Sequence, residues 1–193
     1  NADNEKGWYN LGMDSDFATA SFVGNRSDLR LSLSTFDTRD LLSFVAPGTY
    51  IESGTSINAS LDSLGGISGS ILSGRFAKGK NNIKNLQADI SGTLENAYAT
   101  IISDEVTLGS ITLDNSSLVA NLKDRKCMTF DFNFDDKAEK KSSADIHGQA
   151  TMLSKQNINL EIRPSTLTIS GDEWTIPLCR ISKPGDDISI DSL

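Results

Sequence analysis

The chain has 193 residues, of which 37% are apolar, and it carries 18 basic against 26 acidic side chains for a formal charge of -8. This acidic balance, without a basic cluster, repels phosphate backbones, so we expect no nucleic acid as a partner. No run of apolar residues is longer than three, which excludes a transmembrane helix and a signal-peptide core from this sequence. A chain of this length fits one domain or one slice of a longer, repetitive protein, and its start at Asn1 without Met leads us to expect a processed protein or an excised fragment.

The first predicted elements are two strands, Phe17–Val23 and Leu29–Leu33, which a polar turn joins into a hairpin. The next segment, Asp37–Ala46, breaks the alternation. Asp37 can cap it, apolar residues lie one helical turn apart, and Pro47 ends it, so we expect one short helix there. Residues 1–16 are expected to form an N-terminal extension, and residues 17–193 a single β domain.

The rest of the chain alternates between apolar and polar residues, as strands do when successive side chains leave on opposite faces. The clearest strand is Met128–Phe134. The apolar residues change from even positions in Val106–Leu108 to odd positions in Ile111–Leu113. This change of parity predicts a bulge or a tight turn at Gly109–Ser110. The polar run Asp135–Ser143 is typical of an exposed loop. The other predicted strands contain Ile57–Leu61, Ile67–Ile71, Leu86–Leu94, Leu118–Leu122, Ala144–Met152, Ile158–Ile162, Leu167–Ile169, Trp174–Ile176 and Ile188–Ile190.

These patterns give about thirteen strands joined by short turns, which makes neighbouring strands antiparallel. An antiparallel sheet that is apolar on one face must cover that face, and one short helix cannot do so. The predicted fold class is therefore all-β and mainly antiparallel, with two solutions open. One is a closed sandwich with a dry core, and the other is a strongly curved sheet folded around an apolar groove.

Few residues carry the signature of chemistry. His147 is the only histidine and lies on the polar parity of its strand, so we interpret it as a solvent-facing residue rather than a catalytic base. No nucleophile motif of the Gly-x-Ser-x-Gly type occurs, and we expect neither an enzyme, a cofactor nor a metal site. Cys127 and Cys179 are 52 residues apart, which permits a disulfide or two free thiols.

Three segments carry a resemblance to a known family. The octapeptide Ile90-Ser-Gly92-Thr-Leu94-Glu-Asn96-Ala97 is similar to a recurrent Leu-x-Gly-x-Leu-x-Asn-Pro strand pair, with Ala97 in the place of the usual Pro. The helix Asp37–Val45, followed by Pro47 and residues 54–67, has a similar helix, turn and strand spacing. Residues Leu160–Leu193 hold a Trp-x-Ile block at Trp174. In this order, the segments resemble the TamB and AsmA-like family (translocation and assembly module B) of periplasmic lipid-conducting proteins.

The resemblance implies a periplasmic groove of the β-taco type, anchored to the inner membrane through a segment outside this chain. Such a groove would shield acyl chains and conduct phospholipid between the inner and outer membranes, supporting outer-membrane biogenesis. It implies phospholipid acyl chains as partners, together with an outer-membrane barrel protein of the BamA/TamA type. The residues expected to line the groove are Leu86, Ile90, Leu94, Leu108, Leu113, Leu118, Leu122, Met128, Phe130, Phe132, Phe134, Ile146, Ile158, Leu160 and Ile162.

An alternative function fits the same one-sided strands. A cell-surface adhesin or carbohydrate-binding module with a β-sandwich fold would seal the apolar faces against each other. The two functions therefore differ in whether the apolar face is open.

Overall fold

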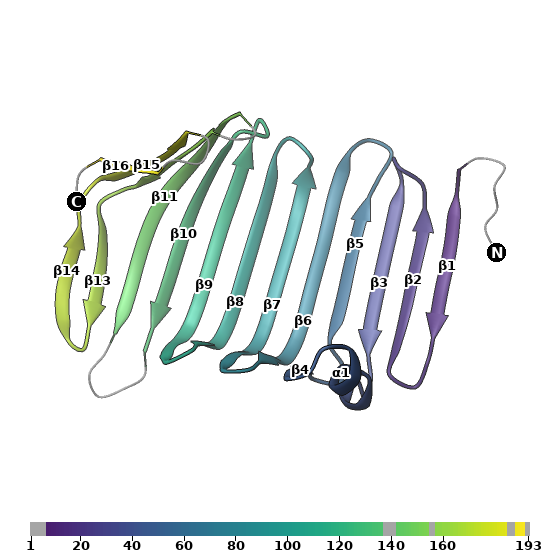
Figure 1. The fold of residues 1–193 in the computed structure, drawn as a ribbon. Helices are drawn as coiled ribbons and strands as arrows, with labels where there is room; N and C mark the ends of the chain where they lie inside the picture. The colour runs from purple at the N-terminus through teal and green to yellow at the C-terminus, as the bar shows by residue number, and fades with distance from the viewer. Residues whose placement is uncertain (1–6, 137–141, 155–156, 185–187, 192–193) are drawn as a thin grey trace.

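The computed structural model describes residues 7–136, 142–154, 157–184 and 188–191. In this part of the chain there are sixteen strands and one short helix, and every strand pair is antiparallel (Figure 1). The elements are β1 (Tyr9–Asp14), β2 (Ala18–Gly24), β3 (Leu29–Thr35), α1 (Arg39–Val45), β4 (Thr49–Ile51), β5 (Ser56–Leu61), β6 (Gly66–Lys78), β7 (Asn81–Thr93), β8 (Ala97–Leu108), β9 (Ile111–Lys123), β10 (Cys127–Asp135), β11 (Ser143–Ser154), β12 (Asn157–Ile162), β13 (Ser165–Ile169), β14 (Asp172–Ile176), β15 (Cys179–Pro184) and β16 (Ser189–Asp191).

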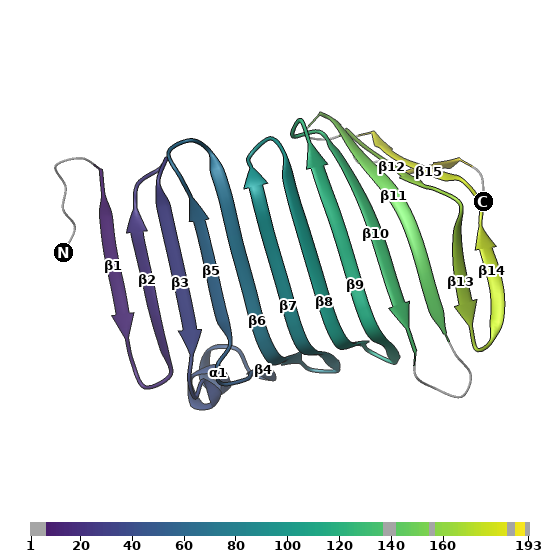
Figure 2. The same ribbon diagram turned by 180° about the vertical axis from the view of Figure 1, so that it is seen from behind.

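All of these strands belong to one sheet, whose main path runs from β1 to β16. Two long strands each pair with two shorter ones along one side: β6 with β5 and β4, and β11 with β12 and β13. The sheet is curved and open, with β1 at one edge and the C-terminal strands at the other (Figures 1 and 2). The prediction of an all-β, curved, mainly antiparallel sheet with one short helix is confirmed.

The described part of the chain contains no sealed core. Its only buried apolar residues are Ala18, Ala144 and Cys179, and no large side chain in it is fully buried. A two-sheet sandwich would bury many large side chains between its layers, whereas here all described strands form a single sheet. The open alternative for the apolar face is therefore the one that the chain adopts.

Several predicted boundaries differ from the structure. Tyr9–Asp14, expected in the N-terminal extension, forms the edge strand β1 against β2. The helix covers Arg39–Val45 rather than 37–46, because Thr38 is its N-cap residue and the Ala46 N–H already closes it by donating to the Leu42 carbonyl. There are sixteen strands rather than about thirteen, since short strands such as β4 show no alternation. Of the predicted loop at 135–143, residues 137–141 lie outside the described residues.

Candidate functional site: an open apolar trough

The strand register places the apolar residues of nearly every strand on one face of the sheet, which we call the apolar face. Directly opposed residues in antiparallel strands share a face, so a row of partners can be followed from strand to strand. One row crosses the sheet without a charged or hydroxyl-bearing side chain: Leu11, Phe22, Leu31, Ala59, Gly69, Ile90, Ala99, Ala120, Phe130, Gly148, Ile162 and Cys179. The apolar face is therefore continuous from β1 to β15.

A second row, two residues further along each strand, is equally apolar. It consists of Met13, Ala20, Leu33, Ile57, Ile71, Ala88, Ile101, Leu118, Phe132 and Ile146. The residues between these two rows point to the opposite side, which we call the polar face. They are Gly12, Ser21, Ser32, Asn58, Ser70, Asp89, Thr100, Val119, Asp131 and His147.

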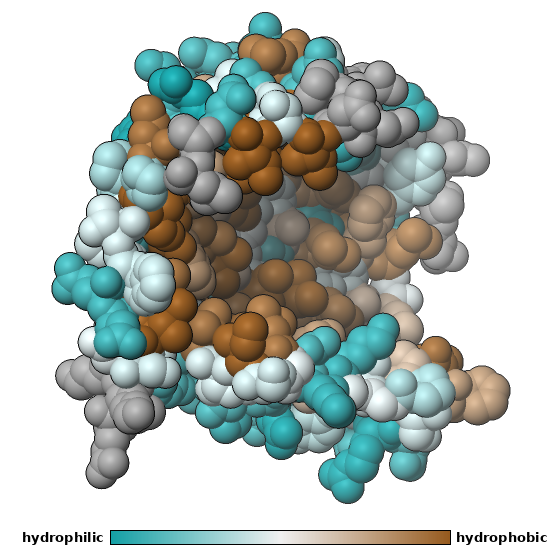
Figure 3. All heavy atoms as spheres, turned by 60° about the vertical axis from the view of Figure 1, so that its left-hand side comes forward, coloured by the Kyte–Doolittle hydropathy of each residue, from teal (hydrophilic) through white to brown (hydrophobic). Residues whose placement is uncertain are grey.

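The apolar face lines a hollow that is open to the outside. In Figure 3, apolar side chains cover the inside of a deep trough, while hydrophilic ones predominate on its outer surface. The trough is not filled by other parts of the described chain, because Leu31, Ile90 and Ile101 remain 38%, 40% and 40% exposed. Large contiguous apolar surfaces that stay exposed are typical of sites that bind a partner, a membrane or a ligand.

Two apolar cavities lie on the floor of the trough. One, of about 270 Å³, is bounded by β5 to β8 and includes Ile57, Ile71 and Ile90. The other, of about 180 Å³, is bounded by β7 to β10 and includes Leu86, Leu118 and Phe132. Their linings bring together residues from strands that are far apart in the sequence.

Fourteen of the fifteen predicted lining residues lie in strands, on the apolar face. The second cavity and the two apolar rows account for Leu86, Ile90, Leu118, Phe130, Phe132, Ile146 and Ile162. A third row, two residues from the first, contains Leu122, Met128 and Leu160, and Leu108, Leu113, Phe134 and Ile158 continue the same face toward the strand ends. The strand register thus places these residues on a common face. Lipid contact by these residues stays a prediction.

Leu94 is the exception. It lies in the turn after β7, where its N–H donates to the Gly65 carbonyl (3.2 Å), and its side chain is 50% exposed at the rim. The strand ends one residue earlier because Gly92 has a φ of 131° and the Thr93 N–H closes the turn on the Asn96 carbonyl (2.7 Å). The alternation that placed Leu94 in the groove therefore stops before it.

Sequence reasoning missed the N-terminal half of the trough. The predicted lining begins at Leu86, whereas the apolar face extends over β1 to β6 with Leu11, Leu31, Ile57 and Ile71. The signal was present, because the same alternation of apolar and polar residues occurs in those strands.

A line of interrupted pairing, which we call the crease, crosses the four neighbouring strands β6 to β9. One residue on each strand is left out of the pairing, Gly74 opposite Asn85 and Asp104 opposite Asn115, and the same register resumes beyond it. Asn85 and Asn115 have φ values of 51° and 46°, a left-handed conformation that asparagine tolerates. Residues three apart on a regular strand point to opposite faces. At the crease this alternation is reversed, so Ile83 and Leu86 both line the 180 Å³ cavity.

Small buried hydroxyl residues accompany the crease. Ser103 Oγ lies within hydrogen-bonding distance of the Lys84 carbonyl (2.7 Å) and the Glu105 carbonyl (3.0 Å), and Thr55 Oγ1 bonds Ser73 Oγ (2.8 Å). On the polar side, Lys84 Nζ contacts Glu105 Oε2 at 2.7 Å, and this hydrogen bond lowers the pKa of Glu105. The two Ser103 contacts reach backbone carbonyls beside the interrupted ladder.

His147 lies on the polar face, as predicted, between two carboxylates. Its Nδ1 is 2.5 Å from Asp131 Oδ1, and its Nε2 is 3.2 Å from Asp145 Oδ1. The hydrogen bond to Asp131 is the main cause that raises the pKa of His147. Since both ring nitrogens face acceptors, the doubly protonated ring fits this position best.

Both cysteines are free. Cys127 is in β10 and Cys179 in β15, with β11 and β12 between them. Three strand spacings of about 4.8 Å put their backbones roughly 14 Å apart, far beyond the reach of a disulfide. Of the two alternatives left open by the sequence, the structure shows free thiols.

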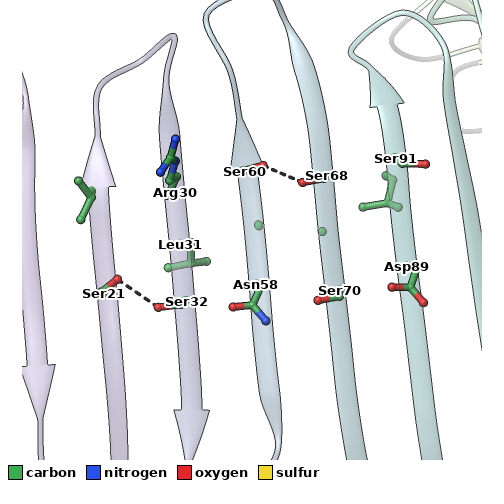
Figure 4. Close-up of a pocket in the computed structure, with 14 residues that line it drawn as sticks. Ser21, Arg30, Leu31, Ser32, Asn58, Ser60, Ser68, Ser70, Asp89 and Ser91 are labelled. Carbon is green, nitrogen blue, oxygen red and sulfur yellow. Dashed lines mark hydrogen bonds between the residues drawn. The ribbon is translucent and has the colours of Figure 1, made fainter.

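The polar face carries a shallow groove of about 720 Å³ across β2, β3, β5, β6 and β7 (Figure 4). Its lining is rich in serine, and two cross-strand pairs bond to each other: Ser21 with Ser32 at 3.1 Å and Ser60 with Ser68 at 2.7 Å. Hydroxyls at such positions are satisfied by one another and by water. This face therefore has no need of a covering partner.

Comparison with known proteins gives no relative of this chain: no family model, no curated protein and no solved structure matches it. Within the described residues, no three histidine, cysteine, aspartate or glutamate side chains are grouped so as to hold a metal ion. Among those residues there is also no helix long and apolar enough to span a membrane.

Proposed function

We propose that this chain is a segment of a groove protein that shields acyl chains and conducts phospholipid along its apolar trough. The proposal follows the resemblance to the TamB and AsmA-like family and includes its setting. The segment would work in the periplasm, attached to the inner membrane through a part of the protein outside this chain. It would deliver lipid toward an outer-membrane barrel protein of the BamA/TamA type.

The observation that carries the proposal is the unbroken apolar row from Leu11 to Cys179 on an open sheet. Each Phe or Leu side chain gains roughly 1.5–3 kcal/mol when it is fully removed from water, and here much of that gain is still unrealised. An acyl chain supplies the missing apolar contacts without needing a directional partner. Since the rows contain no fixed polar group, such a chain can also move along them.

The test is photo-crosslinking in intact cells from two positions on the apolar face and two on the polar face. A photoreactive residue at Phe132 or Leu118, which are register partners, is expected to form lipid adducts. The same residue at Thr129 or Asn133 on β10 is the matched control, because these side chains leave the strand on the opposite face.

Adducts from the first pair alone support the proposal. Equal labelling from both faces, or none from either, contradicts it.

A further inference from the structure

The helix α1 is a mostly exposed element at the end of the sheet. None of its residues is buried, and Phe44 and Val45 are 88% and 60% exposed. With Leu41 they occupy positions i, i+3 and i+4, so the three share one side of the helix. We call Leu41, Phe44 and Val45 the apolar knob. A seven-residue helix in water is not stable by itself, and this one lacks the buried face that normally supports such a helix.

The knob is nevertheless held firmly at the rim of the trough. The Thr49 N–H donates to the Ala46 carbonyl (3.1 Å), and Thr38 Oγ1 donates to the Ile51 carbonyl (3.2 Å), so both ends of α1 are tied to β4. In turn, β4 pairs with β6, and the Gly79 N–H donates to the Gly48 carbonyl (3.0 Å). In Figure 1, α1 lies at the lower ends of β3 and β5.

Basic side chains lie beside the knob. Lys78 is the register partner of Thr49, and Lys80 follows Gly79 in the β6–β7 turn. On the helix itself, Arg39 is 3.8 Å from Asp37, and Asp40 is the remaining acid. These five side chains sum to a charge of +1, while the whole chain carries -8. Exposed apolar side chains next to lysines are typical of elements that lie in the interface of a membrane.

We propose that the apolar knob docks on the surface of a lipid bilayer containing anionic lipid, with Lys78 and Lys80 against the headgroups. This inference rests on the proposed function, because it names the surface from which lipid would reach the rim of the trough. A second copy of the chain is a poorer occupant. A stable protein interface buries about 1,200–2,000 Å², more than three side chains on two turns of helix can supply.

The experiment is flotation of the purified chain with vesicles of phosphatidylcholine, with and without phosphatidylglycerol. The double variant Phe44→Ser/Val45→Ser is expected to lower the partition coefficient at least about tenfold, as loss of one buried Phe alone would do. The variant Lys78→Ser/Lys80→Ser is expected to lose about fivefold per lysine on phosphatidylglycerol vesicles only. The matched control is Leu64→Ser, which removes a side chain that is 93% exposed in the β5–β6 turn.

Unchanged flotation of the double variant, or an equal loss with Leu64→Ser, overturns the inference. So does a dimer in light scattering that the double variant abolishes, since the knob would then contact protein. Failure of this inference and failure of the proposed function can be told apart. Lipid adducts at Phe132 without knob-dependent flotation leave the trough proposal standing, and flotation without adducts leaves only the docking surface.

Discussion

Two adjacent register pairs on β10 and β11 show how differently the two faces are built. Phe130 opposes Gly148 on the apolar face, and one residue further along Asp131 opposes His147 on the polar face. The glycine makes room for the ring, since a Cβ at position 148 would lie only 2.3 Å from Phe130 Cζ. The second pair meets through a hydrogen bond between ionisable groups.

The difference explains why only the apolar face is left without contacts to cover its side chains. The polar side chains satisfy each other and water, as Ser60 with Ser68 and His147 with Asp131 do. The apolar side chains have only dispersion contacts within their own layer, and no second layer of the described chain covers them. Substitutions that change the polarity, volume or charge of one face can therefore test whether the two faces are stabilised in these different ways.

The largest effect is expected from Phe132→Asp, which puts a charge on the apolar face. Loss of the ring, which lies 6.0 Å from the Phe134 ring, and partial dehydration of the carboxylate should lower the free energy of unfolding by about 2–4 kcal/mol. Because the trough is open, the charge keeps some water and the sheet survives. Chemical denaturation and far-UV circular dichroism measure the two outcomes.

Thr129→Asp is the matched control, because it adds the same charge to the same strand from the polar face. Its register partners are Gln149 and Asn121, which are uncharged, so a change within about 0.5 kcal/mol is expected. A complete, cooperative loss of fold in Phe132→Asp would mean that the apolar face is sealed rather than open.

The second effect in size is that of Gly148→Ala. A Cβ there would meet the Phe130 ring and also the Glu161 carbonyl oxygen at 2.9 Å, so both the ring and the neighbouring strand β12 must shift. We expect a loss of about 1–3 kcal/mol in a urea titration. Gly12→Ala in β1, where nothing lies within 4 Å of the added Cβ, should change the midpoint little. Equal losses in both variants would show that the packing of Phe130 does not decide the cost.

The sequence predicts the two faces well because alternation is a local property. Met128, Phe130 and Phe132 fall on one side whatever their neighbours do, and the structure confirms it. Whether that side is open could not be predicted, since the burial of a face depends on what packs against it and not on its own pattern. The same limit applies to Leu94, whose parity is right but whose strand ends at Thr93.

Regular alternation did not predict the crease, although the sequence marks it by a change in alternation at two asparagines. Ile83 is on an odd position and Leu86 on an even one, with Asn85 between them. Likewise, Leu113 and Leu118 differ in parity across Asn115. An asparagine at each change of parity indicates a left-handed residue and a local interruption of the pairing.

A third, smaller effect is expected at the crease. Ser103→Ala removes the buried hydroxyl that bonds the Lys84 carbonyl, and it leaves this acceptor without that partner in a part-buried position. A loss of about 1–2 kcal/mol is expected in thermal or urea unfolding. Ser70→Ala in the polar-face groove is the control, because water can replace its hydroxyl at no measurable cost. If Ser103→Ala also leaves the stability unchanged, the Ser103 hydroxyl does not stabilise the crease.

The smallest effect concerns pH and belongs to the polar face alone. The hydrogen bond to Asp131 raises the pKa of His147 above its unfolded value of about 6.5. The stabilisation is therefore fully present below about pH 6.5 and is lost as the pH rises through the raised pKa of the folded state. Since the His147 side chain is 40% exposed, we expect a loss of less than about 1 kcal/mol between about pH 6 and pH 9.

Urea midpoints across this range, for the unaltered chain and for Asp131→Asn, measure that loss. The substitution removes the main cause of the raised pKa, so the slope of stability against pH should become flatter. Gly148→Ala, which changes the neighbouring pair on the apolar face, should keep the original slope while lowering every midpoint. If Asp131→Asn leaves the slope unchanged, the pH dependence does not come from the His147–Asp131 pair. The statement that this pair stabilises the polar face would then be wrong.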